Sequence, residues 1–183
     1  MYRAMALYII RNGVKAEESD VISRICKDAD ITIVFENGEQ IVLLNGENVN
    51  SLIRTEEVGN MASACSVNKD VRLKLVELQR NLPNCQDVVM DGRDIGTYVL
   101  PNADLKIYLT ASSYVRAKRR YDELVERGES CDLEKIEKDI IERDNRDMTR
   151  EFAPLKKAED AIVIDSSEMT LKEVEETILS HVK

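Results

Sequence analysis

The spacing of apolar residues predicts helices over much of the chain. Apolar positions recur every three or four residues in several segments, and we expect a helix in each: residues 1–11, 19–27, 56–61, 71–81, 112–127, 133–148 and 170–181. Gly13 and Gly128 follow two of these segments and predict helix ends, and Pro83 predicts the end of a third. Ser112 or Ser113 is expected to cap the helix that begins there.

Runs of β-branched and aliphatic residues predict strands elsewhere. Residues 31–35 and 40–44 are separated by Glu36-Asn37-Gly38-Glu39, a sequence typical of the turn in an antiparallel hairpin. Shorter apolar runs predict three further strands, over residues 88–90, 105–109 and 161–165. These later strands alternate with helices, which indicates a parallel sheet with right-handed crossovers. We therefore expect an α/β fold with a small antiparallel unit among its first helices.

Size and charge narrow the class of protein. The chain has 183 residues, which fits one compact domain. Its 35 acidic and 26 basic residues give a net charge of -9, which argues against general binding to DNA or RNA. No apolar run approaches the ~20 residues that span a membrane, and the N-terminus has no signal-peptide cleavage pattern. We expect a cytoplasmic protein that binds neither nucleic acid nor membrane.

The cysteines and the histidine give no sign of a metal centre. Cys26, Cys65, Cys85 and Cys131 are scattered without any C-x-x-C pair, as in a reduced cytoplasmic chain. His181 is the only histidine, and it lies near the C-terminus. A zinc site needs several such ligands at close spacing, so we expect no metal site built by the protein itself.

The first candidate site is the turn after the predicted strand at 88–90. Asp91, Gly92, Arg93, Asp94 and Gly96 place carboxylates, a guanidinium and glycines directly beyond that strand. Ligands of parallel sheets bind just beyond the carboxyl ends of the strands, and glycine lets a ligand approach the backbone closely. The alternative is a solvated polar turn, which is common on protein surfaces.

The second candidate site is the charged end of the helix over 133–148. Arg143, Asp147 and Arg150 follow one another at helical spacing and share a face, which Arg146 borders. Guanidinium groups suit two-pronged contacts with phosphate. The alternative is an exposed face carrying the ion pairs Arg143–Asp147 and Glu142–Arg146, each worth only ~0.3–0.5 kcal/mol.

A third segment concentrates positive charge near the start of a helix. Arg116, Lys118, Arg119 and Arg120 lie within five residues and repel one another unless an anion or an acidic partner is near. A mobile lid that closes over phosphates would use such a cluster. The alternative is a basic helix face packed against acidic neighbours, of which the helix itself has several.

Together these segments resemble bacterial cytidylate kinase. The matching strings are DGRDIGT at 91–97, P-x-A-x-x-K-I-Y-L at 101–109, RAKRR at 116–120 and ERDNRD-x-x-R at 142–150. The segments 53–58 and 60–63 are similar to the family's pyrimidine-side insert, and the resemblance runs from Met1 to the end of the chain. It implies a P-loop nucleoside-monophosphate-kinase-like parallel sheet with helices on both faces, in a single domain over 1–183. It also implies a nucleoside-monophosphate-binding insert at about 26–62 and a helical lid at about 116–131.

The resemblance implies a role for individual residues. The positions that match those reading the cytosine base are Ser63, Arg72 and Asp94. A carboxylate can accept from the cytosine amino group, whereas uracil would set an oxygen against it. The positions that match monophosphate contacts are Arg3, Arg93 and Arg150. Those near the sugar and phosphate are Arg143 and Asp147, and the lid that closes over ATP carries Arg116, Arg119 and Arg120.

The implied reaction is phosphoryl transfer from ATP to CMP or dCMP with Mg²⁺, in a protein that is monomeric in the intact family. Such transfer depends on positioning and on charge neutralisation, and the arginines expected to supply the catalytic charge are Arg93, Arg143 and Arg150.

One expected motif is absent from the sequence. Kinases of this kind hold ATP on a P-loop, G-x-x-x-x-G-K-[ST], and none of the seven glycines has that spacing. In the family this loop and a central strand precede the position of Met1, so the chain resembles an N-terminally truncated kinase. We expect little kinase activity and marginal stability, since the strands beside the missing one gain open edges. The alternative is a short, non-catalytic nucleotide-binding or regulatory protein derived from such a kinase.

Overall fold

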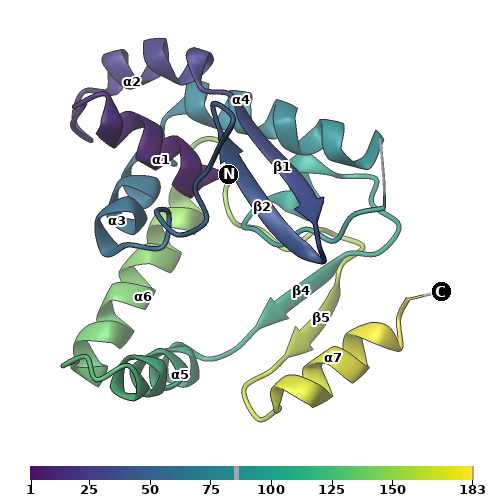
Figure 1. Cartoon of the computed structure of the whole chain (residues 1–183). Helices are drawn as coiled ribbons and strands as arrows, with labels where there is room; N and C mark the ends of the chain where they lie inside the picture. The colour runs from purple at the N-terminus through teal and green to yellow at the C-terminus, as the bar shows by residue number, and fades with distance from the viewer. Residues whose placement is uncertain (85–86, 183) are drawn as a thin grey trace. The chain divides into compact units, whose positions relative to one another are not determined.

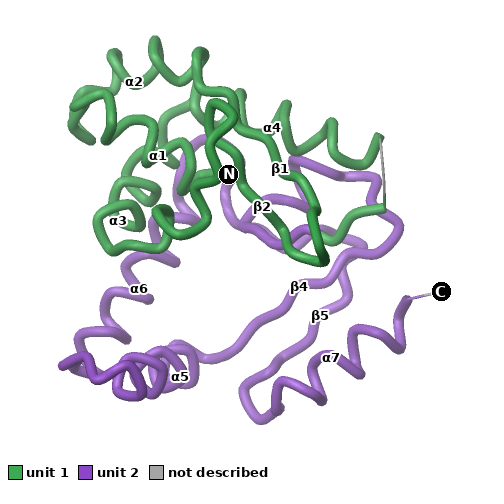
Figure 2. The backbone as a smooth tube through the Cα atoms, viewed as in Figure 1, with its two compact units in different colours: residues 1–89 green, residues 90–183 purple. Residues whose placement is uncertain are grey.

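The computed structural model describes residues 1–84 and 87–182, so Cys85 lies outside the described residues. The chain forms two compact units, Met1–Val89 and Met90–Lys183 (Figure 2). Helices, a small antiparallel sheet and a parallel pair of strands make up these units. The predicted α/β class is therefore confirmed. The bounds predicted for one domain over 1–183, for an insert at about 26–62 and for a lid at about 116–131 stay predictions.

Unit 1 contains four helices at the predicted places (Figure 1): α1 (Tyr2–Arg11), α2 (Ser19–Ile25), α3 (Glu56–Cys65) and α4 (Lys69–Asn81). Short 3-10 turns follow α2 and α4, η1 (Cys26–Asp28) and η2 (Leu82–Asn84). Thr55 caps α3 by accepting from the Val58 N–H at 3.3 Å. Asn68 caps α4 by accepting from the N–H groups of Asp70 and Val71. Such caps satisfy the donors that the first turn leaves open.

The predicted hairpin is confirmed. Strands β1 (Ile31–Glu36) and β2 (Glu39–Leu44) pair antiparallel, and a short third strand, β3 (Glu47–Asn48), pairs with β2. Asn37 and Gly38 form the turn with φ of 53° and 82°. A two-residue turn with positive φ at both positions matches the twist of the strands, and asparagine followed by glycine tolerates it best.

One apolar core holds unit 1 together. Helix α1 packs against α3, and its residues Ala4, Met5, Ala6 and Ile9 are completely buried. The remaining buried residues of this core come from α1, α2, η1, the hairpin, α3, α4 and the segments between them: Leu7, Ile22, Cys26, Ala29, Ile31, Val42, Leu44, Val49, Val58, Ala62, Cys65, Val71 and Leu75. Burial of aliphatic side chains contributes about 1.5–3 kcal/mol for each large residue, so this core dominates the stability of unit 1.

Unit 2 has the expected order of strands and helices. The parallel strands β4 (Ile107–Thr110) and β5 (Ile162–Asp165) are connected by α5 (Ser113–Glu126) and α6 (Leu133–Thr149), and α7 (Leu171–Leu179) follows. Ser112, one of the two predicted candidates, caps α5 by accepting from the Val115 N–H. Thr170 and Glu173 form a reciprocal capping box at α7.

The prediction of a strand over 88–90 is wrong. These residues have no strand partner among the described residues, and the Val89 side chain is fully exposed at 103 %. An isolated extended segment cannot pair its backbone groups in a ladder, so the apolar run alone does not make a strand. Beyond it, η3 (Ile95–Val99) is a π turn in which Tyr98 and Val99 both donate to the Asp94 carbonyl. The sequence pattern did not predict this turn, and such turns often accompany functional sites.

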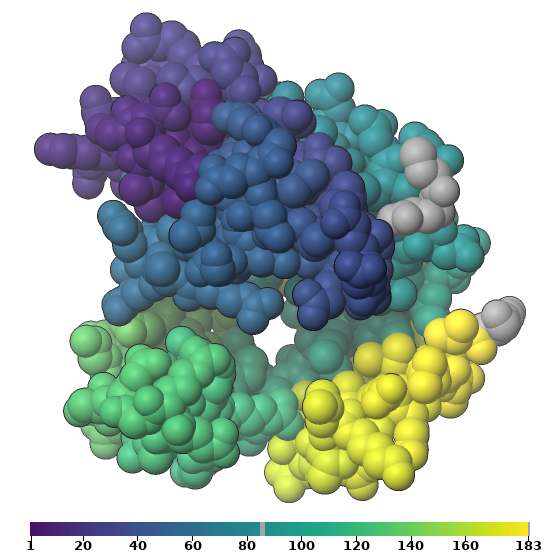
Figure 3. Space-filling view, viewed as in Figure 1, coloured from purple at the N-terminus to yellow at the C-terminus, as the bar shows by residue number. Residues whose placement is uncertain are grey.

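Unit 2 buries little apolar surface. Its buried hydrophobic residues in the described part of the chain are Val99, Ala111, Ala117 and Ile164. Helix α7 has no buried residue, its Leu171 is 86 % exposed, and Figure 3 shows the helix in yellow at the surface. No helix among the described residues is both long enough and apolar enough to cross a membrane.

Candidate functional site

In unit 2 the predicted polar turn and the charged end of α6 lie together. Arg93 donates from Nε to the Asp147 carboxylate at 3.0 Å. Arg150 donates to the other oxygen of Asp147 at 3.5 Å, and its guanidinium lies 3.9 Å from the carboxylate of Asp94. Asp147 thus lies between two guanidinium groups, and Arg150 lies between two carboxylates. We call Arg93, Asp94, Asp147 and Arg150 the carboxylate–arginine cluster.

Three of the four side chains of the cluster are sheltered from solvent, whereas that of Arg93 is 44 % exposed. The side chains of Arg150 and Asp94 are only 9 % and 8 % exposed, and that of Asp147 is 14 % exposed. Alternating positive and negative groups compensate one another, which makes their burial tolerable. The two surface ion pairs of the alternative interpretation do not occur among the described residues. Within the turn Asp94 is buried, whereas Asp91, Gly92 and Arg93 are exposed.

Arg150 reaches the cluster in a different way from the one expected. Helix α6 ends at Thr149, and Arg150 has φ of -61° and ψ of 142°, so it does not continue the helical face of Arg143 and Asp147. Its side chain is held instead by the chain that follows, because Nε donates to the Ala153 carbonyl at 2.8 Å. The turn at Ala153, with φ of 48°, therefore orients the guanidinium.

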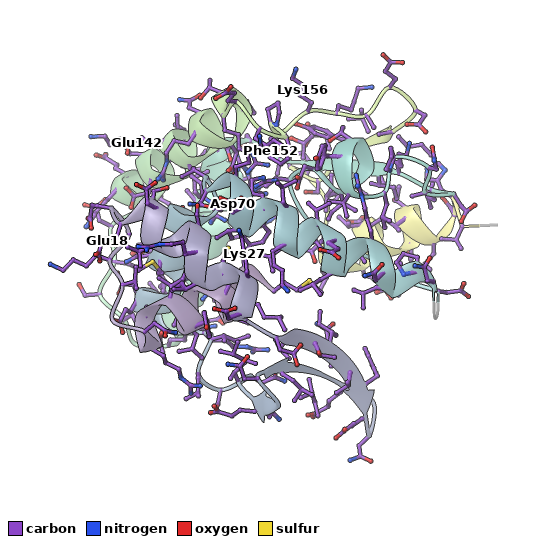
Figure 4. All side chains as sticks on the ribbon, turned by 90° about the horizontal axis from the view of Figure 1, so that it is seen from above. Glu18, Lys27, Asp70, Glu142, Phe152 and Lys156 are labelled. Atoms are coloured by element: carbon purple, nitrogen blue, oxygen red, sulfur yellow. The ribbon has the colours of Figure 1, made fainter. Side chains whose placement is uncertain are left out.

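Two aromatic residues that the sequence reasoning missed support this arrangement. Tyr98 of η3 and Phe152 pack edge to face with ring centroids 4.9 Å apart, and Phe152 is labelled in Figure 4. Contacts of this geometry contribute about 0.5–1.5 kcal/mol beyond area burial. The pair joins the turn after Asp94 to the segment after Arg150. Each of the two aromatic residues lies next to a charged motif in the sequence, and this position was the only sequence signal of their role.

Arg143 carries a charge that the structure does not neutralise. Among the described residues it has no hydrogen bond and no ion pair, and desolvation lowers its pKa, as does the neighbouring charge of Arg93. Asp147 acts in the opposite direction but does not outweigh these effects. An anion bound beside Arg143 would act in the same direction as Asp147 and raise this pKa.

The basic segment of α5 is already paired within unit 2. Arg116 donates to Asp144 of α6 at 2.6 Å and to the Ala111 carbonyl at 3.1 Å. Lys118 pairs with Asp122, and Arg120 pairs with Glu123 at 2.8 Å. Acidic partners thus offset the repulsion within the segment, as the alternative of a basic helix face packed against acidic neighbours predicts.

Arg119 joins α5 to the end of the parallel sheet. Its guanidinium donates to the carbonyl of Ser166 at 2.6 Å and to the carbonyl of Met169 at 3.3 Å. Ser166 is almost completely buried directly after β5. In this structure Arg119 therefore fixes the turn beyond β5.

Unit 1 contains the other three predicted site residues. Arg3 donates to the carbonyls of Ile53 at 2.9 Å and Thr55 at 3.4 Å. Arg72 is 2 % exposed, donates to the Ser66 carbonyl at 3.2 Å and lies 5.8 Å from the centre of the Tyr2 ring. Ser63 is linked to the same loop, because the Ser66 hydroxyl donates to its carbonyl at 2.8 Å. Ser66 thus connects Ser63 and Arg72.

The remaining titratable groups suggest no separate chemistry. Cys26 and Cys65 are buried, and burial raises the pKa of the Cys65 thiol to about 12, so it stays protonated at neutral pH. Within the described ranges no group of three or more histidine, cysteine, aspartate or glutamate side chains is placed to hold a metal ion.

Comparisons with known proteins place the chain among nucleotide kinases, which is consistent with its α/β fold. The family model described as cytidylate kinase matches residues 1–183. A cytidylate kinase of Caldicellulosiruptor saccharolyticus is 49% identical over 179 residues, which is 98% of this chain and 79% of the relative. Cytidylate kinases of Citrifermentans bemidjiense and Thermosipho melanesiensis are 43% and 45% identical across the whole chain, covering 78% and 82% of their lengths. The chain belongs to the cytidylate kinase family, and by family it is a kinase with ATP as co-substrate.

Proposed function

We propose that this chain serves phosphoryl transfer from ATP to CMP or dCMP. The observation that carries the proposal is the carboxylate–arginine cluster, in which Asp147 accepts from Arg93 at 3.0 Å and from Arg150 at 3.5 Å. Oriented guanidinium groups neutralise the charge that spreads over a transferring phosphoryl group. Membership in the cytidylate kinase family supports ATP as the phosphoryl donor and CMP as the acceptor.

We assign the acceptor phosphate to arginines. Arg93 and Arg150 are held by Asp147, and Arg143 forms no ion pair among the described residues. Planar guanidinium groups bind phosphate oxygens in pairs. We further assign Asp147 to the sugar hydroxyls, since one carboxylate can accept several hydrogen bonds, and Arg3 to the phosphate.

We assign the base to Asp94, Ser63 and Arg72. Asp94 is buried. A buried carboxylate binds a hydrogen-bond donor such as the cytosine amino group more tightly than an acceptor such as the uracil oxygen. Arg72 is likewise buried and supplies donors for the ring acceptors. The preference for cytosine would then come from hydrogen bonding and not from size.

ATP would bind with Mg²⁺ on its phosphates, because water and phosphate oxygens supply most of the ligands of this ion. We propose that Arg116, Arg119 and Arg120 form the lid. For that role Arg116 must exchange Asp144 for phosphate, and Arg119 must leave the Ser166 carbonyl. The protein would work as a cytoplasmic monomer, without nucleic acid or membrane.

The test is a coupled assay with ATP, Mg²⁺ and CMP on a polypeptide of these 183 residues. No G-x-x-x-x-G-K-[ST] motif occurs in the sequence to cradle the ATP phosphates, so we propose that turnover is slight while CMP still binds. Binding of CMP without any turnover would also fit the alternative of a non-catalytic nucleotide-binding protein. Joining a P-loop segment from a relative to the N-terminus separates the two: restored transfer to CMP supports the kinase, and continued inactivity with intact binding supports the binder.

A further inference from the structure

Unit 1 contains a cavity that none of the assigned residues except Arg3 uses. It has a volume of about 440 Å³, and its walls include Tyr2, Arg3, Gln40, Val42, Asn50 and Arg54. Small-molecule sites typically occupy 300–1,000 Å³. The wall formed by β2 is fixed, because the Asn50 side chain accepts from the Val42 N–H at 2.9 Å and donates to the Gln40 carbonyl at 2.8 Å.

The charges around this cavity are all of one sign. Arg3 and Arg54 are its charged side chains, and no carboxylate lines it. Glu56 and Glu57, which follow Arg54 closely in the sequence, line a different cavity of about 590 Å³ together with Asn60 and Met61. Among the described residues the smaller cavity is thus lined by basic and not by acidic side chains, which favours an anionic ligand.

The two arginines differ in how they are held. The Arg3 guanidinium donates to the carbonyls of Ile53 and Thr55, the residues on either side of Arg54. These carbonyls orient Arg3 without neutralising it. Arg54 is exposed, and it has neither a hydrogen bond nor an ion pair among the described residues. One guanidinium is thus fixed in place, and the other is available to close on a ligand.

We propose that Arg54 is a further substrate-binding residue, which contacts the phosphate of the nucleoside monophosphate in the cavity that Arg3 lines. The inference rests on the proposed function. Two guanidinium groups give a phosphate dianion more charge-assisted hydrogen bonds than one. Arg54 contacts the phosphate of the acceptor nucleotide and not the phosphoryl group that is transferred. It therefore contributes affinity for the acceptor and for phosphate-bearing ligands generally.

The test compares CMP with cytidine, which lacks the phosphate, by titration calorimetry on the full chain. We expect Arg54→Gln to weaken CMP binding about tenfold, which corresponds to one lost charge-assisted contact, and to leave cytidine binding unchanged. Arg54→Lys should recover part of the loss. The matched control is Arg24→Gln, which removes an equally exposed charge from α2, outside the cavity, and it should bind CMP as the unchanged protein does.

The outcomes separate this inference from the proposed function. If the unchanged protein does not bind CMP, both are overturned. If it binds CMP and Arg54→Gln binds CMP equally well, or loses cytidine to the same extent, Arg54 has no phosphate contact while the proposed function stands. Inorganic phosphate gives a second readout: its dissociation constant, obtained by competition and corrected for the CMP affinity of each protein, should rise in Arg54→Gln, and an unchanged constant would contradict the proposal.

Discussion

The Arg93 guanidinium lies 3.0 Å from the Asp147 carboxylate and joins two segments that are 54 residues apart in the sequence. The same carboxylate holds Arg150, whose guanidinium approaches Asp94. One acidic side chain of α6 thus orients two arginines assigned to phosphate. Removing it should affect ligand binding more than folding.

We therefore predict that Asp147→Asn weakens CMP binding about tenfold or more, because hydrogen bonds to charged groups contribute about 1.5–3 kcal/mol. Calorimetric titration measures the change. Asp139→Asn, an exposed carboxylate of the same helix, serves as the control and should bind CMP normally. Equal affinities of Asp147→Asn and Asp139→Asn would show that Asp147 does not organise the phosphate-binding arginines.

Asn68 should contribute strongly to the stability of unit 1. It accepts from the N–H groups of Asp70 and Val71, and its amide donates to Ser19 and Ser23 of α2. We expect Asn68→Ala to lower the free energy of unfolding by about 2 kcal/mol, since it removes a helix cap and leaves buried groups unsatisfied. Urea denaturation measures this value.

A suitable comparison is Asn12→Ala, whose exposed side chain donates only to the Tyr8 carbonyl. Its effect should stay within about 0.5 kcal/mol. A loss at Asn68 no larger than that at Asn12 would mean that α2 and α4 are held by packing alone.

The two units should differ in local stability. The large apolar core lies within unit 1, and the buried hydrophobic residues of unit 2, among those described, are only Val99, Ala111, Ala117 and Ile164. Segments with little buried apolar surface open with the lowest free energy. We expect native-state hydrogen exchange to show faster exchange in α5 and α7 than in α1 and α4. Uniform protection across both units would contradict this account of the packing.

The capping box of α7 should make its stability depend on pH. Hydrogen bonds from the Thr170 backbone and hydroxyl lower the pKa of Glu173 below its ordinary value of 4.5. The stabilisation is therefore complete above the pKa of the unfolded chain and is lost as the pH falls through the lower pKa of the folded chain. Helix content of α7, followed by NMR in the unchanged protein and in Glu173→Gln, should differ at pH 7 and converge at low pH. A difference that persists at low pH would exclude the carboxylate as its cause.

Local signals in the sequence predicted the elements that depend on local interactions. Asn37 and Gly38 tolerate the positive φ of the hairpin turn, and Ser112 satisfies the first donors of α5. The strand expected over 88–90 failed because a strand needs a neighbour, and apolar residues alone do not supply one.

The candidate site was predictable in part for the same reason. The motifs at 91–97 and 142–150 indicated charged groups that belong together, and Arg93 and Asp147 do meet. The route by which Arg150 arrives depends on the turn at Ala153, and the contact of Tyr98 with Phe152 depends on tertiary packing. Neither leaves a periodic signal in the sequence.

We propose that this chain binds cytidine monophosphate, and the most direct test is a comparison of CMP and UMP binding by titration calorimetry. We predict that CMP binds at least tenfold more tightly than UMP, and that Asp94→Asn reduces this preference, since one well-paired base contact contributes about 1–3 kcal/mol of discrimination. Equal affinity for CMP and UMP, or a preference that survives Asp94→Asn unchanged, would contradict the account.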